Sequence, residues 1–255
     1  MDLKIKHFVV FITIGLAISC KQQVLNVSKI EGKEIRIDTT IPQNDSTNAY
    51  IKPFRDRVNQ ILDSTLAYAP KKITKVDGIY NTTAGNLLAD IIFSAAAPIF
   101  KSRTNNNLDF VFFNHGGIRS IISQGKVSAR TAFEVMPFEN TMVVAELSGK
   151  SIKKMLAYLL DSGMAHPISG IQIVLNTDNT LASVKIQGKP FDENRNYFVA
   201  TSDYLAAGGD SMVFFKDALN VTRIDYLIRN AMIDHFKKVD TVAAKVDKRF
   251  YKLAP

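Results

Sequence analysis

The chain has 255 residues, 46% of them hydrophobic, and a formal charge of +8, which suits a single globular domain with its own core. One cysteine leaves no disulfide framework and no thiolate metal site to stabilise it. The basic residues are scattered and not interleaved with aromatic ones, which favours a solvated basic surface with mild attraction for anions and no nucleic acid partner.

The first 19 residues have the pattern of an export signal. They begin with lysines, continue as an apolar run too short to span a bilayer and end in Ser19, which predicts a secretory signal peptide over 1–19. Cys20 follows, and the segment 16–20 resembles the lipobox of bacterial lipoproteins, in which the cysteine is acylated. We expect an exported lipoprotein anchored through Cys20, on the periplasmic or cell-surface face of a bacterial envelope. The alternative is a cysteine without that role.

A polar stretch and an amphipathic segment follow. Residues 20–48 are interpreted as a lipid-anchored tether with a candidate edge strand at 31–40 and a turn at 42–45. Residues 50–67 place apolar side chains at helical spacing with charges between them, which predicts a helix lying on a core. The remaining residues, 49–255, are predicted to form one domain.

The next stretch predicts a buried helix and a buried strand. A short strand is expected at 73–76, and residues 83–100 predict a deeply buried helix capped by Thr83. The run 108–113 has the composition of a buried strand. It leads directly into the hexapeptide 114–119.

That hexapeptide contains a Gly-Gly turn at a strand end. Gly116 and Gly117 let the backbone turn sharply and approach a ligand closely. Arg119 offers a fork of donors, and Asn114 offers a donor and an acceptor. A plain loop with a surface arginine explains this segment equally well on its own.

Residues 128–148 predict a helix, a loop and a strand. Ser128 opens a short helix, and Pro137 forces Phe138 into a loop before a strand at 141–147. An aromatic residue in such a loop either folds back into the core or stands in a pocket, and the segment alone favours the core. Gly149-Lys150-Ser151 lacks the upstream glycine of a phosphate-binding loop, so it is interpreted as the start of a helix that ends near residue 160.

The C-terminal part contains a second glycine turn. Strands are predicted at 170–175, 182–186 and 197–201, with antiparallel pairing. The last strand leads into Tyr204 and then Gly208, Gly209 and Asp210, which again combine an aromatic residue, a Gly-Gly turn and a charge. Residues 222–238 predict a closing amphipathic helix with a capping box.

These segments together resemble the C-terminal, substrate-binding domain of the 5'-nucleotidase family. The matching motifs are Gly85-Asn86-Leu87 with Ala89-Asp90, Asn114 to Arg119, Met136-Pro137-Phe138 and Leu205 to Asp210, in the family's order. The resemblance covers the chain from about residue 51. It implies an α+β fold of α/β/β/α layers, with mixed sheets and amphipathic helices outside.

The resemblance also implies a nucleoside clamp. Phe138 and Tyr204 would stack on the two faces of the base, and Asp210 would bind the ribose hydroxyls. Asn114 and Arg119 would bind base and ribose or phosphate, with Gly116, Gly117, Gly208 and Gly209 forming the two turns. The expected ligand is a nucleoside or a nucleoside 5'-monophosphate.

Two departures from the family pattern limit what the chain is expected to do alone. Residues 77–81 lack the arginine that reaches the phosphate in many members. The histidines and aspartates of the family's two-metal catalytic domain are also missing, so we expect no cofactor and no metal in this chain. The resemblance groups the chain with 5'-nucleotidase-type hydrolases, but whether it is itself an enzyme stays open.

Three functional hypotheses remain. The first is a substrate-binding domain that works with a separate metallophosphoesterase chain, which supplies the divalent metals. The second is a non-enzymatic nucleoside- or nucleotide-binding lipoprotein. The third is a generic surface or adhesion protein.

Overall fold

The computed structural model describes residues 7, 8, 10 and 27–254. The chain divides into two compact units, between Tyr50 and Ile51. The predicted signal peptide lies almost wholly outside the described residues, and Cys20 lies outside them entirely. The fold described below is that of the second unit.

A five-stranded mixed sheet forms the centre of this unit, in the order β10-β4-β9-β2-β5. Its central strands β2 and β9 are parallel neighbours, while β4 pairs antiparallel with β9 and with β10. The strands are β2 (Phe110–Phe112), β4 (Thr141–Ser148), β5 (Ile168–Ser169), β9 (Asn196–Ser202) and β10 (Asn220–Leu227). Every residue of β2 is buried, so this strand fixes the loop that follows it.

Two smaller sheets complete the domain. A four-stranded sheet has the order β11-β6-β7-β8, with β11 parallel to β6, and β1 pairs antiparallel with β3. Their strands are β1 (Thr65–Ala69), β3 (Gly125–Ser128), β6 (Ile171–Leu175), β7 (Leu181–Ile186), β8 (Lys189–Pro190) and β11 (Phe250–Lys252). Gly170 joins β5 of the central sheet to β6 of the smaller one.

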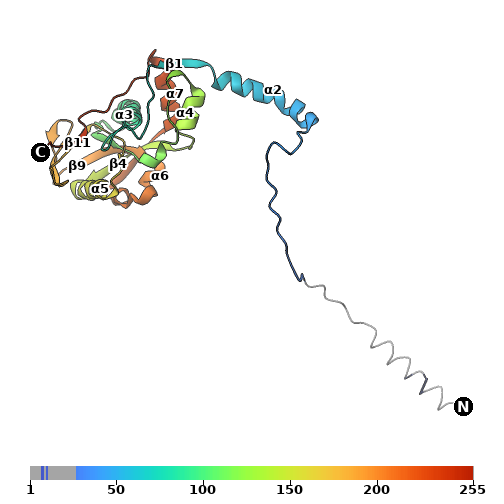
Figure 1. Ribbon diagram of the computed structural model, residues 1–255. Coiled ribbons are helices and arrows are strands. Elements are labelled where there is room, and N and C mark those ends of the chain that lie inside the picture. The colour runs from blue at the N-terminus through green and yellow to red at the C-terminus, as the bar shows by residue number, and fades with distance from the viewer. Residues whose placement is uncertain (1–6, 9, 11–26, 255) are drawn as a thin grey trace. The chain divides into compact units, whose positions relative to one another are not determined.

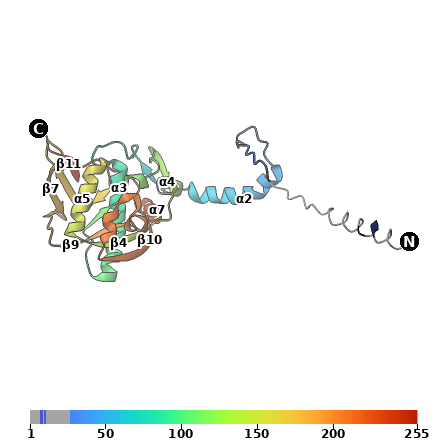
Figure 2. The ribbon, with the colours of Figure 1, turned by 90° about the horizontal axis from the view of Figure 1, so that it is seen from below.

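Helices cover the central sheet. In Figure 1, β4 and β9 run between α3 and α5, and both helices pack on β4. Figure 2 shows β7, β11 and α5 at one end of the domain and α4 and α7 at the other. The helices are α2 (Asp45–Leu62), α3 (Thr83–Thr104), α4 (Ala129–Val135), α5 (Gly149–Ser162), α6 (Asp203–Ala206) and α7 (Ile228–Lys238), with short 3-10 helices η1 (His115–Gly117), η2 (Gly209–Ser211) and η3 (Val213–Asp217).

Helix α3 is the core helix. By length and composition it could cross a membrane, but 56% of its most apolar window is buried in the domain, as expected for the central helix of a globular fold. Its N-cap is Thr82, which accepts a hydrogen bond from the Gly85 amide at 3.1 Å. The predicted cap, Thr83, is therefore the first helical residue.

The segment before β1 differs from prediction. Residues 27–44 contain no strand, so the candidate edge strand at 31–40 is wrong. The predicted helix exists as α2, but it ends at Leu62, and residues 65–67 belong to β1. None of its side chains is buried in the described structure. The periodicity predicted the helix correctly, but burial of its apolar side chains on a core is not seen.

Two other predictions also require correction. The strand expected at 73–76 is reduced to a single bridge between Ile73 and Ile122. The closing helix begins only at Ile228, because residues 220–227 form β10 against β4. Asp225 adopts a left-handed conformation with φ of 54° at an irregularity in β10, so it is not part of a helix cap.

The elements around the two glycine turns are confirmed. Ser128 caps α4 with a capping box, Pro137 and Phe138 lie in a loop, and α5 begins at Gly149. Strands β6 and β7 pair antiparallel as predicted. Strand β9, which was expected to continue that pairing, lies instead in the central sheet, between β4 and β2.

Candidate functional site

The two glycine turns follow neighbouring parallel strands. Strand β2 leads into Asn114 and η1, and β9 leads into α6, Tyr204 and Asp210. Because β2 and β9 are parallel and adjacent, their carboxyl ends lie at the same edge of the sheet. Ligand sites form at this edge in open α/β sheets. The topology therefore brings together two loops that lie far apart in sequence.

The first turn is closely packed. A Cβ atom on Gly117 would lie 2.6 Å from the Asn114 amide oxygen and 2.6 Å from the Phe113 ring, so only glycine fits there. The Arg119 amide donates to the Val135 carbonyl at 2.9 Å, which ties the end of this loop to the end of α4. Asn114 itself is buried.

The second turn is equally constrained. Gly208 has φ of 89°, and a Cβ atom on Gly209 would lie 2.4 Å from the Tyr204 ring. Asp210 adopts a left-handed conformation with φ of 50° and ψ of 33°, which is uncommon for a non-glycine residue. The Tyr158 hydroxyl of α5 donates to the Asp210 carbonyl at 2.9 Å and so supports this conformation.

Asp210 joins the two loops. One carboxylate oxygen accepts a hydrogen bond from the Asn114 amide nitrogen, and the other accepts one from the Tyr204 hydroxyl at 3.1 Å. The Asp210 amide in turn donates to the Tyr204 hydroxyl at 3.2 Å. The carboxylate is thus oriented by both turns and is held at the surface of the site.

A cavity of about 330 Å³ lies between the two loops. Two aromatic rings line it, Phe138 and Tyr204, which remain 39% and 47% exposed. This exposure shows that Phe138 does not fold back into the core. The lining residues are Asn114, Gly116, Gly117, Arg119, Phe138, Asn140, Tyr204 and Asp210.

Arg229 of α7 binds the backbone of the loop that carries Phe138. Its guanidinium donates to the carbonyls of Pro137 and Phe138 at 3.3 and 3.4 Å, and it pairs with Glu139. It also lies over the Phe133 ring, 4.1 Å from the centroid. Arg229 is buried, so it supports the exposed aromatic side chain without lining the cavity.

One cation, Arg119, lines the cavity, and a second, Lys75, lies near it at the first turn without lining the cavity. The Arg119 guanidinium carbon lies 5.8 Å from the centroid of the Phe138 ring, and the Lys75 ammonium lies 3.5 Å from the His115 carbonyl. Burial and the neighbouring Arg119 charge lower the pKa of Lys75. Neither side chain forms an ion pair with another described residue, so their positive charges are available to an anion.

A buried histidine lies behind the first turn. His166 accepts a hydrogen bond from the His115 amide through Nδ1 at 3.2 Å, and its ring stacks on Phe112. Burial, followed by repulsion from His115, lowers the pKa of His166 to about 4. The neutral ring with a proton on Nε2 is therefore the form present at neutral pH, and Nε2 has no partner among the described residues.

The described residues contain no group of three or more His, Cys, Asp or Glu side chains that could hold a metal ion. The cavity therefore offers aromatic faces, amides, one carboxylate and the Arg119 cation, with the Lys75 cation nearby. Such a set can bind a flat, hydroxylated and anionic molecule. Among the described contacts of the site, none pairs a nucleophile with a general base.

The predicted site residues fall into three groups. Seven of them line the cavity: Asn114, Gly116, Gly117, Arg119, Phe138, Tyr204 and Asp210. Gly208 and Gly209 shape the second turn without lining the cavity, and Cys20 lies outside the described residues. Sequence reasoning missed Asn140 and Lys75. Asn140, only two residues after Phe138, had a signal in the sequence, whereas Lys75 is brought close only by the fold.

Comparisons with known proteins identify similar sequences. Residues 67–217 match a family model described as the 5'-nucleotidase C-terminal domain. Protein UshA of Yersinia enterocolitica is 31% identical over 194 residues, which cover 72% of this chain and 33% of the relative. The trifunctional nucleotide phosphoesterase protein YfkN of Bacillus subtilis is 26% identical, over 89% of this chain and 16% of the relative. The chain thus spans a third or less of the length of these two relatives.

A solved structure shows the same fold. The crystal structure of a 5'-nucleotidase precursor from Thermus thermophilus superposes with a TM-score of 0.67 at 23% identity, covering 83% of this chain and 43% of that one. The predicted α+β class with mixed sheets and outer helices is therefore confirmed.

Proposed function

Since the chain belongs to the 5'-nucleotidase C-terminal domain family, we propose that it binds a nucleoside or nucleoside 5'-monophosphate between Phe138 and Tyr204. The two rings hold the faces of the base, and Asp210 accepts hydrogen bonds from the ribose hydroxyls. Asn114 and Asn140 provide amide groups to the edge of the ligand. One observation carries this proposal: two half-exposed aromatic rings face one cavity that also contains an oriented carboxylate.

The expected binding free energy and the cavity volume both suit a small-molecule site. Each aromatic face contributes about 1–3 kcal/mol per stacked base, and a charge-assisted hydrogen bond contributes roughly 1.5–3 kcal/mol. Together, two faces and two charges give on the order of 8 kcal/mol, which is micromolar binding. The cavity volume of about 330 Å³ lies at the lower end of the range of ligand pockets.

In this proposal, Arg119 and Lys75 bind the phosphate of a nucleotide. Both are cations without a carboxylate partner among the described residues, and their mutual repulsion contributes to the lowered pKa of Lys75. An anion placed between them removes this repulsion. Lys75 therefore supplies the second positive charge that the segment 77–81 lacks.

Hydrolysis is assigned to a second component. Phosphate-ester hydrolysis by two-metal chemistry needs divalent metals that polarise the phosphate and activate water. In the proposal these metals are held by a separate metallophosphoesterase chain, and this chain orients the substrate. A relative called the cell wall protein Lmo0130 of Listeria monocytogenes, 27% identical over 209 residues, agrees with an exported location. The lipid anchor at Cys20 is part of the proposal.

Binding is tested by calorimetric titration of the full chain with adenosine, AMP and ribose 5-phosphate. We expect micromolar binding of adenosine and AMP and much weaker binding of ribose 5-phosphate, which has no base to stack. Equal affinity for all three ligands, or none for adenosine, would overturn the clamp.

The catalytic assignment has its own test. The purified chain with Mn²⁺ or Zn²⁺ is expected to release no phosphate from AMP, and rapid hydrolysis would refute the need for a second chain. A non-enzymatic nucleoside-binding lipoprotein is the competing function, because the binding features all lie within this chain. A metallophosphoesterase chain that hydrolyses AMP faster when this chain is added supports the first function over the second.

A further inference from the structure

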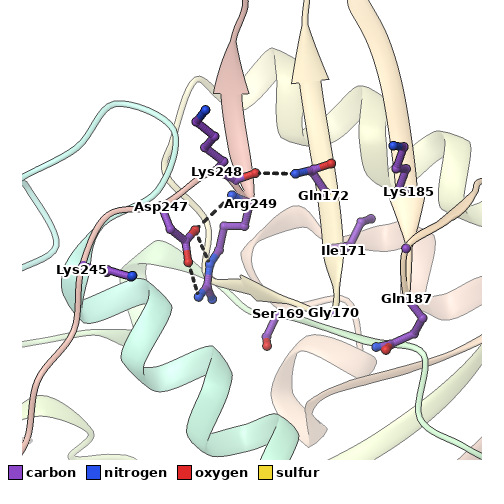
Figure 3. A pocket seen from close by; sticks show the side chains of 11 residues that line it. Ser169, Gly170, Ile171, Gln172, Lys185, Gln187, Lys245, Asp247, Lys248 and Arg249 are labelled. Carbon is purple, nitrogen blue, oxygen red and sulfur yellow. Dashed lines mark hydrogen bonds and ion pairs between the residues drawn. The ribbon is translucent and has the colours of Figure 1, made fainter.

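A second hollow, shallow and widely open to solvent, has a volume of about 610 Å³ and shares no lining residue with the candidate site. It lies where β6 and β7 meet the segment 245–249, and Figure 3 shows its side chains from close by. We call it the lysine recess after Lys185, Lys245 and Lys248. Its other lining residues are Ser169, Gly170, Ile171, Gln172, Gln187, Gly188, Asp247 and Arg249.

The recess is positively charged. Four cations and one carboxylate line it, and both oxygens of that carboxylate, Asp247, accept hydrogen bonds from Arg249 at 2.9 Å. Arg249 also binds Asp90 of α3 at 2.9 and 3.0 Å, so its charge is balanced within the protein. None of the three lysines forms an ion pair with a described residue. Asp247 also attracts the Lys245 charge, so the lining carboxylate offsets the positive charge of the three lysines only in part.

The backbone that carries two of these lysines is held in place although it has no regular secondary structure. The buried Asn86 donates to the Lys245 carbonyl at 2.9 Å, and Gln172 donates to the Lys248 carbonyl at 2.9 Å. Between them, the buried Asn81 binds the Asp247 backbone at both its carbonyl, 3.0 Å, and its amide, 3.1 Å. The lysine backbones are thus fixed before any ligand arrives, which lowers the entropic cost of binding.

The floor of the recess is also closely fitted. Gly170 has φ of 83°, and a Cβ atom there would lie 2.7 Å from both the Asp109 carbonyl oxygen and the Gln187 amide nitrogen. Gln187 donates to that carbonyl at 2.6 Å, so its side chain is fixed at the floor. Figure 3 shows Gln172 between Lys248 and Lys185, so it adds an uncharged polar group there, while Gln187 adds one at the floor.

The donors favour one class of anion. Arg249 is the planar fork that would suit a carboxylate, but its donors already serve Asp90, Asp247 and the Ile168 carbonyl. The free donors are ammonium groups, which act as point charges and are common phosphate ligands. The volume lies within the range of small-molecule sites. We infer that the lysine recess binds a phosphate group, carried either by a free small molecule or by a phospholipid headgroup.

Two ligand arms distinguish these sources. In the first, the full chain is titrated with inorganic pyrophosphate and glycerol 1-phosphate by calorimetry. In the second, it is sedimented with phosphatidylcholine vesicles that either contain or lack phosphatidylglycerol. Binding in the first arm alone identifies a free phosphate compound, binding in the second alone identifies a headgroup, and binding in both identifies the phosphate itself. No binding in either arm overturns the inference.

The assignment to this recess is tested with matched triple variants. Lys185→Gln with Lys245→Gln and Lys248→Gln is expected to weaken phosphate binding by about tenfold or more, because charge-assisted hydrogen bonds are lost. Lys71→Gln with Lys72→Gln and Lys150→Gln removes the same charge from outside the recess and is expected to leave binding within about twofold. Equal loss in both variants, or full binding by the first, overturns the inference. None of the six lysines changed in these variants forms an ion pair with a described residue, so both variants are expected to unfold at the wild-type temperature.

Discussion

At the scale of single residues, the two aromatic rings decide whether the cavity is a nucleoside clamp. Phe138→Ala is expected to weaken adenosine binding by about 1–3 kcal/mol, or roughly 5- to 150-fold, because one stacked face is lost. Tyr204→Ala is expected to weaken it by at least as much, because it removes a stacked face and also the hydroxyl that orients Asp210. Both side chains are substantially exposed, so the unfolding temperature should change little. Calorimetry and thermal unfolding on the same samples check this. Full affinity in both variants would refute stacking.

Tyr158 is a positioning residue for Asp210. Its hydroxyl supports the left-handed Asp210 backbone from α5, and Tyr158→Phe removes only that hydrogen bond. We expect adenosine binding to weaken by about 0.5–1.5 kcal/mol, the net contribution of a hydrogen bond. Binding of 2',3'-dideoxyadenosine should stay unchanged, because that ligand lacks the hydroxyls assigned to Asp210.

The comparison of the two ligands separates positioning from general destabilisation. Tyr226→Phe is the matched control. Tyr226 lies on β10, away from the cavity, and its hydroxyl also binds an aspartate, Asp234. If Tyr158→Phe weakens both ligands equally, the hydroxyl does not act through the ribose. If wild type itself fails to bind adenosine, the clamp fails rather than the role of Tyr158.

At the scale of elements, α7 supports the loop of the first aromatic ring. Arg229→Met keeps an apolar stem against Phe133 but leaves the Pro137 and Phe138 carbonyls without their donor. We expect a loss of about 1–3 kcal/mol of stability and faster amide exchange in the loop that carries Phe138. Arg223→Met, on exposed β10, is the control and should change neither quantity. Unchanged exchange in the loop would show that Arg229 does not hold it.

The elements also show how far sequence reasoning extends. Ser128 and Pro137 act through local geometry, so the short helix and the loop of Phe138 were predicted correctly. The strand β10 was missed, because residues 222–227 show the same spacing of apolar side chains as the helix that follows, and only pairing with β4 selects the strand. Lys75 and Tyr158 were missed as site residues for the same reason, since their relation to the site arises from tertiary contacts.

The position of the two glycine turns next to each other could be predicted only in part from the sequence. Both motifs are visible in sequence, and the resemblance to the family places them in one site. Their adjacency arises from the parallel contact between β2 and β9, which no local pattern encodes. The antiparallel pairing expected for the C-terminal strands holds for β6 with β7, but it places β9 in the wrong sheet.

At the scale of the whole molecule, stability is expected to depend on pH through His166. Its pKa is lowered to about 4 in the folded protein from an ordinary value of 6.5. Between these values the unfolded chain binds the proton and the folded chain does not, so the unfolding free energy falls as pH falls from about 6.5 toward 4. The loss is on the order of 3 kcal/mol at the lower end. The pKa of His235 is also lowered by burial and by Lys238, and it acts in the same direction.

Urea unfolding of wild type, His166→Phe and His235→Gln at several pH values between about 7.5 and 4.5 measures this dependence. His166→Phe keeps an aromatic ring against Phe112 and removes the titrating group, so its unfolding free energy should vary less with pH than that of wild type. His235→Gln should remove a smaller part of the slope. Asp247, whose pKa is lowered, loses its stabilising charge only in more acidic solution, outside this window. A His166→Phe curve parallel to that of wild type would show that the buried ring is not the group that titrates.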